Sequence, residues 1–434
     1  MTRGAGAIFR DLERARKAVP VRLRTMLVDR FLRVGTLLFV ASVISNFLSL
    51  LFQVTMGRML TPADYGTMNA LLSTFMIAVI PFTTISMVLT REVSFHRAHG
   101  QLASVRRLFH WTYRRVGRVG LPALGAFILL SPAVRQFLQI DTPTPVILLG
   151  VVIFVAVSFP VNLAFLGGLQ RFVSMAITSG LLGPLKYTLC VLFVVLGWGI
   201  DGVFIGHIFC YLGLFFISYW PLRRVLSRIT GAAAEPRRVF ATAYPELLAN
   251  LAFAFMTQFD LVLTKHLFSS DLVGTYAVAA VFGRAVMYLP AGLIMALFPI
   301  VAENYALNED QTNVLWKALA YTLLCSGCGT LLYWLFPGAI LGILFPGKYL
   351  ESASLLALYG AAMLPMALLL ITMNFHIARG HRGVWVFIAV GVVVEICSIL
   401  LWHTNLTQIL GALFAGGVTS LLLSLRSVIR DFRC

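Results

Sequence analysis

Long runs of apolar residues, separated by short polar segments, make up most of this sequence. A run of about 18 or more apolar residues is long enough to cross the hydrocarbon core of a bilayer as a helix. The pattern therefore predicts an all-α polytopic membrane protein. Its spans, about twelve in number for this length, are expected at residues 34–57, 65–90, 112–132, 144–168, 173–198, 201–221, 243–266, 272–302, 314–337, 351–376, 384–402 and 407–426.

The composition excludes other classes of protein. Of the 434 residues, 59% are hydrophobic and 12% are charged, whereas soluble domains are about 45–50% apolar and about 25% charged. A soluble globular protein is therefore excluded, and so is a disordered chain, because so much apolar surface does not stay unfolded in water. The twelve spans also leave no room for a soluble domain of any size.

The net charge of +17 is interpreted as a topology signal, because cytoplasmic loops of membrane proteins accumulate Lys and Arg. With the N-terminus inside, 28 of the 34 Lys and Arg residues fall in cytoplasmic segments and 4 on the opposite side. Both termini are therefore predicted to be cytoplasmic. Nucleic acid is not an expected partner.

The same map predicts five segments along the chain. In the N-terminal segment, residues 1–33, apolar positions share one helical face and basic residues surround it. This pattern fits a helix lying on an anionic membrane surface, and a disordered basic tail is the alternative. The segments are a basic cytoplasmic N-terminal segment (1–33), an N-lobe of six spans (34–221), a cytoplasmic linker (222–242), a C-lobe of six spans (243–426) and a cytoplasmic tail (427–434).

An internal repeat relates the two lobes. At a constant offset of 208 residues, Gly66 and Thr67 fall on Gly274 and Thr275, between the first and second spans of each half. Because each half has an even number of spans, the halves are expected to be parallel repeats related by an axis along the membrane normal. Two pseudo-symmetric six-helix lobes with short outward loops are typical of an alternating-access transporter.

Two cations fall near the middle of predicted spans, where ionisable groups are costly and mark functional sites by default. Lys186 follows Pro184, and Arg284 precedes Pro290. One cation from each lobe suits an anionic ligand held between the lobes. The alternative is that a protein carboxylate neutralises each of them. Two further cations, ranked lower because they lie at span ends, complete the predicted substrate site: Arg91 and Arg58.

The acidic candidates are Glu246, Asp260 and Glu395, which we interpret as residues for ion coupling or for pairing with cations. A helix-end ion pair with Lys265 is the alternative for Asp260. Cofactors and bound metals are not expected. The CxxC formed by Cys325 and Cys328 lies in an apolar helix, where buried small side chains are the better interpretation.

Two stretches carry a family resemblance, GRMLTPADYGTMNALLSTF after the first span and FDLVLTKHLFSSDLVGTYAVAAVF in the seventh and eighth spans. They resemble the polysaccharide transporter branch of the multidrug/oligosaccharidyl-lipid/polysaccharide (MOP) superfamily, which includes the Wzx-type O-antigen flippases. The matching positions run from Leu60 to Gly66, and include Asp260, Gly274, Tyr276 and Ala277.

The resemblance implies a MOP/MATE-like fold, with two lobes forming a V around a cationic cavity. It also implies transport of a polyprenyl-diphosphate-linked oligosaccharide from the inner to the outer leaflet, for cell-surface polysaccharide biosynthesis. A diphosphate needs fixed cations at membrane depth, while the polyprenyl tail stays in lipid. The implied partners are the lipid-linked saccharide and membrane lipids, and the implied location is the bacterial inner membrane.

Alternatives from other classes stay open. A cation-coupled multidrug exporter of the same superfamily should favour a carboxylate-lined cavity. A membrane-embedded glycosyl- or acyltransferase needs clustered catalytic groups, and His96, His99 and His110 stand in a basic segment without paired carboxylates. We therefore expect a transporter rather than an enzyme. A monomer is expected, with polysaccharide-assembly proteins or a secretion complex as open alternatives for association.

Overall fold

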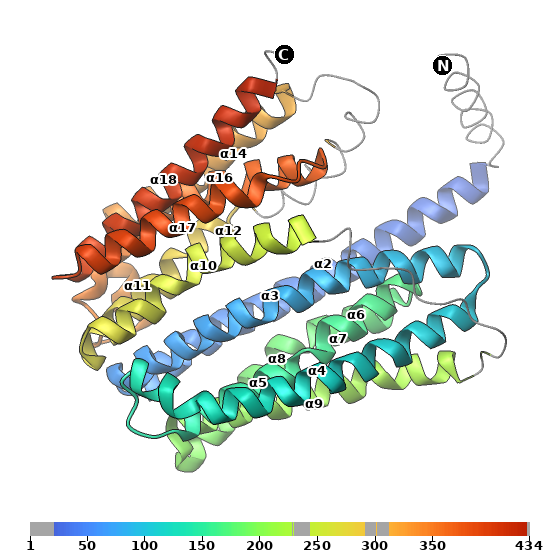
Figure 1. The fold of residues 1–434 in the computed structure, drawn as a ribbon, viewed down its shortest axis with the longest axis horizontal. Coiled ribbons are helices and arrows are strands. Elements are labelled where there is room, and N and C mark those ends of the chain that lie inside the picture. Colours follow the sequence, from blue (N-terminus) through green and yellow to red (C-terminus); the bar gives the residue numbers. More distant parts are fainter. Residues whose placement is uncertain (1–20, 228, 230–243, 291–300, 302–311, 432–434) are drawn as a thin grey trace.

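The computed structural model describes residues 21–227, 229, 244–290, 301 and 312–431. All the regular elements in these ranges are helices (Figure 1). The predicted surface helix at the start of the N-terminal segment lies outside the described residues, as do most of the predicted linker and part of the eighth span. The five predicted segment boundaries stay a prediction.

The N-lobe comprises the helices before the linker. Its second span, α3, begins with Thr61 as the N-cap, whose side chain accepts a hydrogen bond from the backbone N–H of Asp64 at 3.1 Å. The helices are α2 (Val21–Met59), α3 (Pro62–Ala98), α4 (Leu102–Phe137), α5 (Thr144–Ala156), α6 (Ser158–Gly168), α7 (Phe172–Gly180), α8 (Leu182–Phe193), the short π-type turn η1 (Val194–Trp198) and α9 (Gly199–Leu226).

The C-lobe repeats this layout after the linker. Its second span is broken at Arg284, between α11 and α12. The helices are α10 (Tyr244–Leu267), α11 (Ser270–Gly283), α12 (Ala285–Tyr288), α14 (Thr312–Leu335), α15 (Pro337–Leu344), α16 (Ser352–Ala378), α17 (Val384–Leu401) and α18 (Leu406–Asp431).

Ten helical stretches of the described chain are long and apolar enough to cross a membrane. One of them, residues 172–226, contains two predicted spans, which are separated near Gly197 and Gly199, where φ is +89° and +49°. Glycine tolerates this left-handed backbone, so the chain reverses between α8 and α9. The predicted eighth span is helical through Tyr288, and its remainder is largely outside the described residues. The all-α polytopic fold is confirmed.

The two lobes use the same helix pairings, which supports the repeat. In the N-lobe α2 packs on α8, α6 on α3, and α8 on α9; in the C-lobe the corresponding pairs are α10 with α17, α16 with α11, and α17 with α18. Equivalent spans therefore have equivalent neighbours.

The lobes meet through α3, which packs against both α10 and α11. Gly66 and Gly274, the positions matched by the 208-residue offset, face each other there: a β-carbon on Gly66 would lie 2.7 Å from the backbone nitrogen of Gly274. The lobes lie close at this end and diverge toward the end where α2 begins and α18 ends (Figure 1). The predicted V of two lobes is the observed architecture.

Candidate functional site

A buried polar cluster surrounds Arg284 in the C-lobe. Its guanidinium Nη2 lies 2.8 Å from Oδ1 of Asp260, and their side chains are 10% and 0% exposed. The hydroxyls of Tyr276 and Tyr359 both donate to the other carboxylate oxygen, at 2.8 and 2.6 Å. Arg284 also donates from Nε to the Tyr359 hydroxyl at 3.0 Å. Both oxygens of the Asp260 carboxylate are thus engaged.

The cluster extends to the N-lobe through Ser73 on α3. Arg284 Nη1 lies 3.4 Å from the Ser73 hydroxyl, which in turn donates to the side chain of Gln258 at 3.1 Å. Asp260 and Gln258 lie on α10, and Arg284 lies at the junction between α11 and α12, where its N–H still bonds to the carbonyl of Ala280. A charge network therefore lies at the contact between the two lobes.

Of the two alternatives for Arg284, the structure shows pairing with a carboxylate. A buried pair is far cheaper at membrane depth than an isolated cation. The alternative pairing of Asp260 with Lys265 is wrong, because Lys265 donates to the hydroxyl of Ser270 at 2.8 Å.

Glu395 lies on α17, which packs against α10, the helix that carries Asp260. It is 1% exposed, and its Oε2 atom has no hydrogen-bond partner among the described residues. The neighbouring backbone is close, because a β-carbon on Gly416 of α18 would lie 2.9 Å from Cβ of Glu395. Glu246 lies apart, half-buried in the first turn of α10, where the helix dipole favours a carboxylate.

Lys186 on α8 is the second predicted intramembrane cation. Its ammonium donates to the hydroxyl of Ser49 at 2.9 Å and lies 5.1 Å from the ring centre of Phe52, both on α2. Within the described chain it has no salt bridge. Its contacts have no residue in common with those of Arg284, so the structure shows two separate cationic positions, one in each lobe.

Arg58 and Lys348 join the lobes at the end predicted to face outward. Arg58 donates from Nε to the carbonyl of Leu344 at 2.7 Å and from Nη2 to that of Ile343 at 3.0 Å. Lys348 donates back to the carbonyl of Arg58 at 2.9 Å. Arg91, by contrast, is exposed on α3 near its opposite end.

A second set of hydrogen bonds joins the two lobes at His266, the position that the 208-residue offset matches to Arg58. Its Nδ1 lies 2.7 Å from the carbonyl oxygen of Phe137; a carbonyl oxygen only accepts, so Nδ1 carries the hydrogen. Gln139 donates to the carbonyl of His266 at 2.9 Å. We call Arg58, Lys348, Gln139 and His266 the outer clamp.

A model of the family described as polysaccharide biosynthesis protein matches residues 31–305. The chain belongs to this family. The match covers the whole N-lobe and the first two spans of the C-lobe, so it includes Asp260, Arg284, Lys186 and three of the four clamp residues. The resemblance stated from the two sequence stretches is confirmed.

A probable flippase named AglR, from Haloferax volcanii, is 24% identical to this chain over 247 residues. The aligned part is 57% of this chain and 48% of AglR, so the chain matches about half the length of that relative.

Two solved structures are similar in fold. An inward-facing multidrug resistance MATE family transporter of the MOP superfamily superposes with a TM-score of 0.75 at 11% identity, covering 88% of this chain and 94% of that one. Lipid II flippase MurJ, in an inward closed conformation, gives 0.71 at 12% identity, covering 92% and 89%. This member of the polysaccharide biosynthesis protein family therefore has the MOP-superfamily fold.

Several residues of the site were not predicted. Tyr359 and Ser73 approach Arg284, and Tyr276 approaches Asp260, only through packing of separate helices. His266 carried a usable signal, because the 208-residue offset maps it onto the predicted site residue Arg58.

Proposed function

We propose that this protein flips a polyprenyl-diphosphate-linked oligosaccharide from the inner to the outer leaflet by alternating access, for cell-surface polysaccharide biosynthesis. The observation that carries the proposal is the arrangement of two repeated lobes, hydrogen-bonded to each other at one end and divergent at the other. Side-chain contacts that can form at one end and release are what such a mechanism needs. Membership of the polysaccharide biosynthesis protein family supports the substrate class.

Lys186 is the cation that the geometry favours for the ligand's diphosphate. Its charge has no carboxylate partner in the described chain, whereas the charge of Arg284 is matched by Asp260. A diphosphate beside Lys186 would supply the missing counter-charge. Arg284 contributes to the site by holding α10, α11 and α16 together at the lobe contact. Arg91 and Arg58, at opposite ends of the transport path, supply further positive charge for the diphosphate.

Surface-glycan complementation tests the proposal in a strain that lacks its own flippase and carries the matching glycan pathway. Lys186→Ala should lower complementation at least about tenfold, the loss that corresponds to about 1.4 kcal/mol of binding free energy. Lys186→Arg, which keeps the charge, should retain most of it. Arg135→Ala, which removes the same charge from the last turn of α4, is the control. Full complementation by Lys186→Ala at normal membrane levels would remove this residue from the site.

A cation-coupled multidrug exporter is the second candidate, and Glu395 favours it. A buried carboxylate with an unpartnered oxygen can bind and release a proton or cation. If this function holds, expression should raise resistance to organic cations in a drug-sensitive strain, and Glu395→Gln should abolish that resistance. If the flippase function holds, expression should leave drug sensitivity unchanged.

The proposal includes a plasma-membrane location, monomeric action and cytoplasmic termini. The basic residues support this orientation, because Arg91 and the arginines of the first half of α4 lie toward the end of the molecule opposite the outer clamp.

A further inference from the structure

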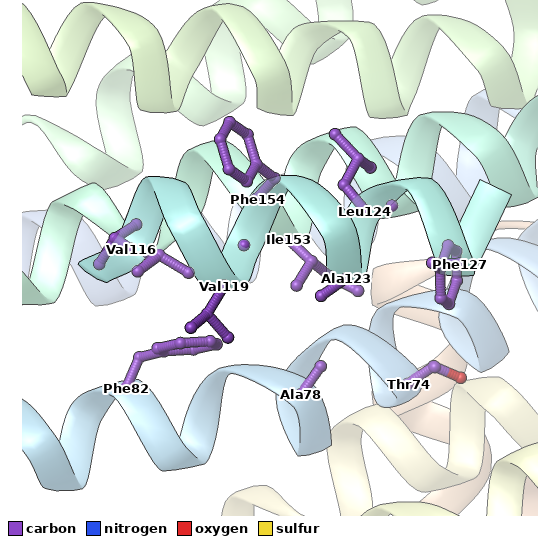
Figure 2. Close-up of a pocket in the computed structure, with 13 residues that line it drawn as sticks. Thr74, Ala78, Phe82, Val116, Val119, Ala123, Leu124, Phe127, Ile153 and Phe154 are labelled. Carbon is purple, nitrogen blue, oxygen red and sulfur yellow. The ribbon is translucent and has the colours of Figure 1, made fainter. Parts of the chain in front are cut away.

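An apolar cavity of about 270 Å³ lies between α3, α4 and α5 of the N-lobe. Ala78 and Phe82 of α3 face Val119, Ala123 and Phe127 of α4 across it, and Phe154 of α5 lies behind them (Figure 2). The one hydroxyl in its wall, that of Thr74, donates to the carbonyl of Ala70 in its own helix. The wall thus offers no free polar group, and suits a hydrocarbon chain.

A row of arginines continues from this cavity along the same helix. Arg114, Arg115 and Arg118 of α4 are exposed. Arg115 immediately precedes Val116, and Arg118 immediately precedes Val119, and both valines line the cavity. They have no salt bridge within the described ranges. Arg106, two turns earlier, is different: it donates to the carbonyl of Ile229 at 2.7 Å and has a structural partner.

The depth of these arginines matches a lipid headgroup. The hydrocarbon core is about 30 Å thick, which about 20 residues of helix cross. Counted back from Arg135 near the outward end of α4, that length ends close to Arg115. Arg114, Arg115 and Arg118 therefore lie at the predicted inner headgroup level, and the cavity lies within the adjoining hydrocarbon.

We propose that this surface is the inner-leaflet docking site for the polyprenyl diphosphate carrier, with the diphosphate at Arg114, Arg115 and Arg118 and one segment of the isoprenoid chain in the cavity. This inference rests on the proposed flippase function. The charge is complementary to a diphosphate. The cavity, of about 270 Å³, has room for one segment of a hydrocarbon chain.

The position also connects docking to the lobe contact. Thr74 lines the cavity, and its neighbour Ser73 contacts Arg284 on the other side of α3. A carrier docked here lies one helix away from the lobe interface, so its headgroup saccharide is next to the path that opening of the lobes would expose.

The test measures binding of undecaprenyl diphosphate to the purified full-length protein in detergent. Ala123→Phe fills the cavity from an exposed position of α4, and should weaken binding at least about tenfold. Ala126→Phe, also exposed on α4 but outside the cavity, is its matched control. The double change Arg114→Gln, Arg118→Gln should weaken binding and flatten its dependence on salt, while Arg135→Gln should not.

Each result decides between the proposals. If the wild-type protein does not bind undecaprenyl diphosphate, the proposed function fails together with the docking site. If the wild type binds and Ala123→Phe binds equally well, the docking site is overturned and the flippase function stands. Equal competition by phosphatidylglycerol would make the surface a general lipid site, and equal competition by inorganic diphosphate would make it a phosphate site; either overturns the inference.

Discussion

At the scale of single residues, the Arg284–Asp260 pair combines a structural role with a place at the lobe contact. Two tyrosine hydroxyls share one oxygen of Asp260, and Arg284 takes the other. Removal of either charge would leave its partner buried without compensation.

We expect Arg284→Ala to lower the free energy of unfolding by about 3–5 kcal/mol, the usual cost of breaking a buried pair. The double variant Arg284→Met, Asp260→Asn should recover much of this loss, because no uncompensated charge remains. Thermal melting of the purified protein measures both. Equal stability of the single and double variants would contradict a coupled pair.

The charge pattern of the sequence was enough to predict both intramembrane cations and to name Asp260 as one possible partner of Arg284. It did not indicate Tyr359, which is 75 residues from Arg284 along the chain. That contact depends on how α16 packs against α11 and α12, and a hydrophobic pattern carries no information about such long-range pairing.

At the scale of elements, the outer clamp depends on the ends of helices. Arg58 and His266 lie in the last turn of the first helix of each lobe. His266 contacts the carbonyl of Phe137 at the end of α4, and Arg58 contacts that of Leu344 at the end of α15, the short helix that follows the third span of the C-lobe. The clamp is therefore made twice, once by each repeat.

Loss of the clamp should open this end of the molecule. In a cysteine-free background, Arg58→Ala with Lys348→Ala should raise the labelling rate of a cysteine placed at Leu60, which is 4% exposed, by a water-soluble maleimide. Lys317→Ala is the control, since Lys317 is exposed near the start of α14. An unchanged labelling rate would show that these contacts do not hold the lobes closed.

Close backbone contact between α3 and α11 leads to a second prediction at this scale. A methyl group on Gly274 would overlap the carbonyl oxygen of Pro62. Gly274→Ala should therefore lower the melting temperature and shift labelling at Leu60 in the same direction as clamp loss. Gly327→Ala, on a helix with open space at that position, should raise stability slightly or leave it unchanged.

Helix positions were largely predictable from apolar runs, but helix ends were not. The third span was expected at 112–132, yet α4 begins at Leu102. Its first turns bury Val105, Leu108 and Phe109 against the N-lobe while arginines occupy the exposed face. A search for continuous apolar runs misses such an amphipathic extension, because only one face is apolar.

At the scale of the whole molecule, the orientation in the membrane is the property that the arginine distribution predicts. A cysteine at Asp141, exposed in the turn after α4, should react with a membrane-impermeant reagent added to whole cells. A cysteine at Arg382, exposed in the turn before α17, should react only after the cells are permeabilised. The reverse pattern would invert every assignment of sides.

The contact between Gly66 and Gly274 bears on the origin of the molecule. Equivalent positions of two repeats meet on a symmetry axis only when the repeats face each other as identical subunits of a two-fold dimer do. A six-span ancestor would have presented this same glycine to its own copy. A β-carbon at either position would meet backbone of the other half, at Gly274 or at Pro62, so two such copies joined in one chain need a small residue at both positions.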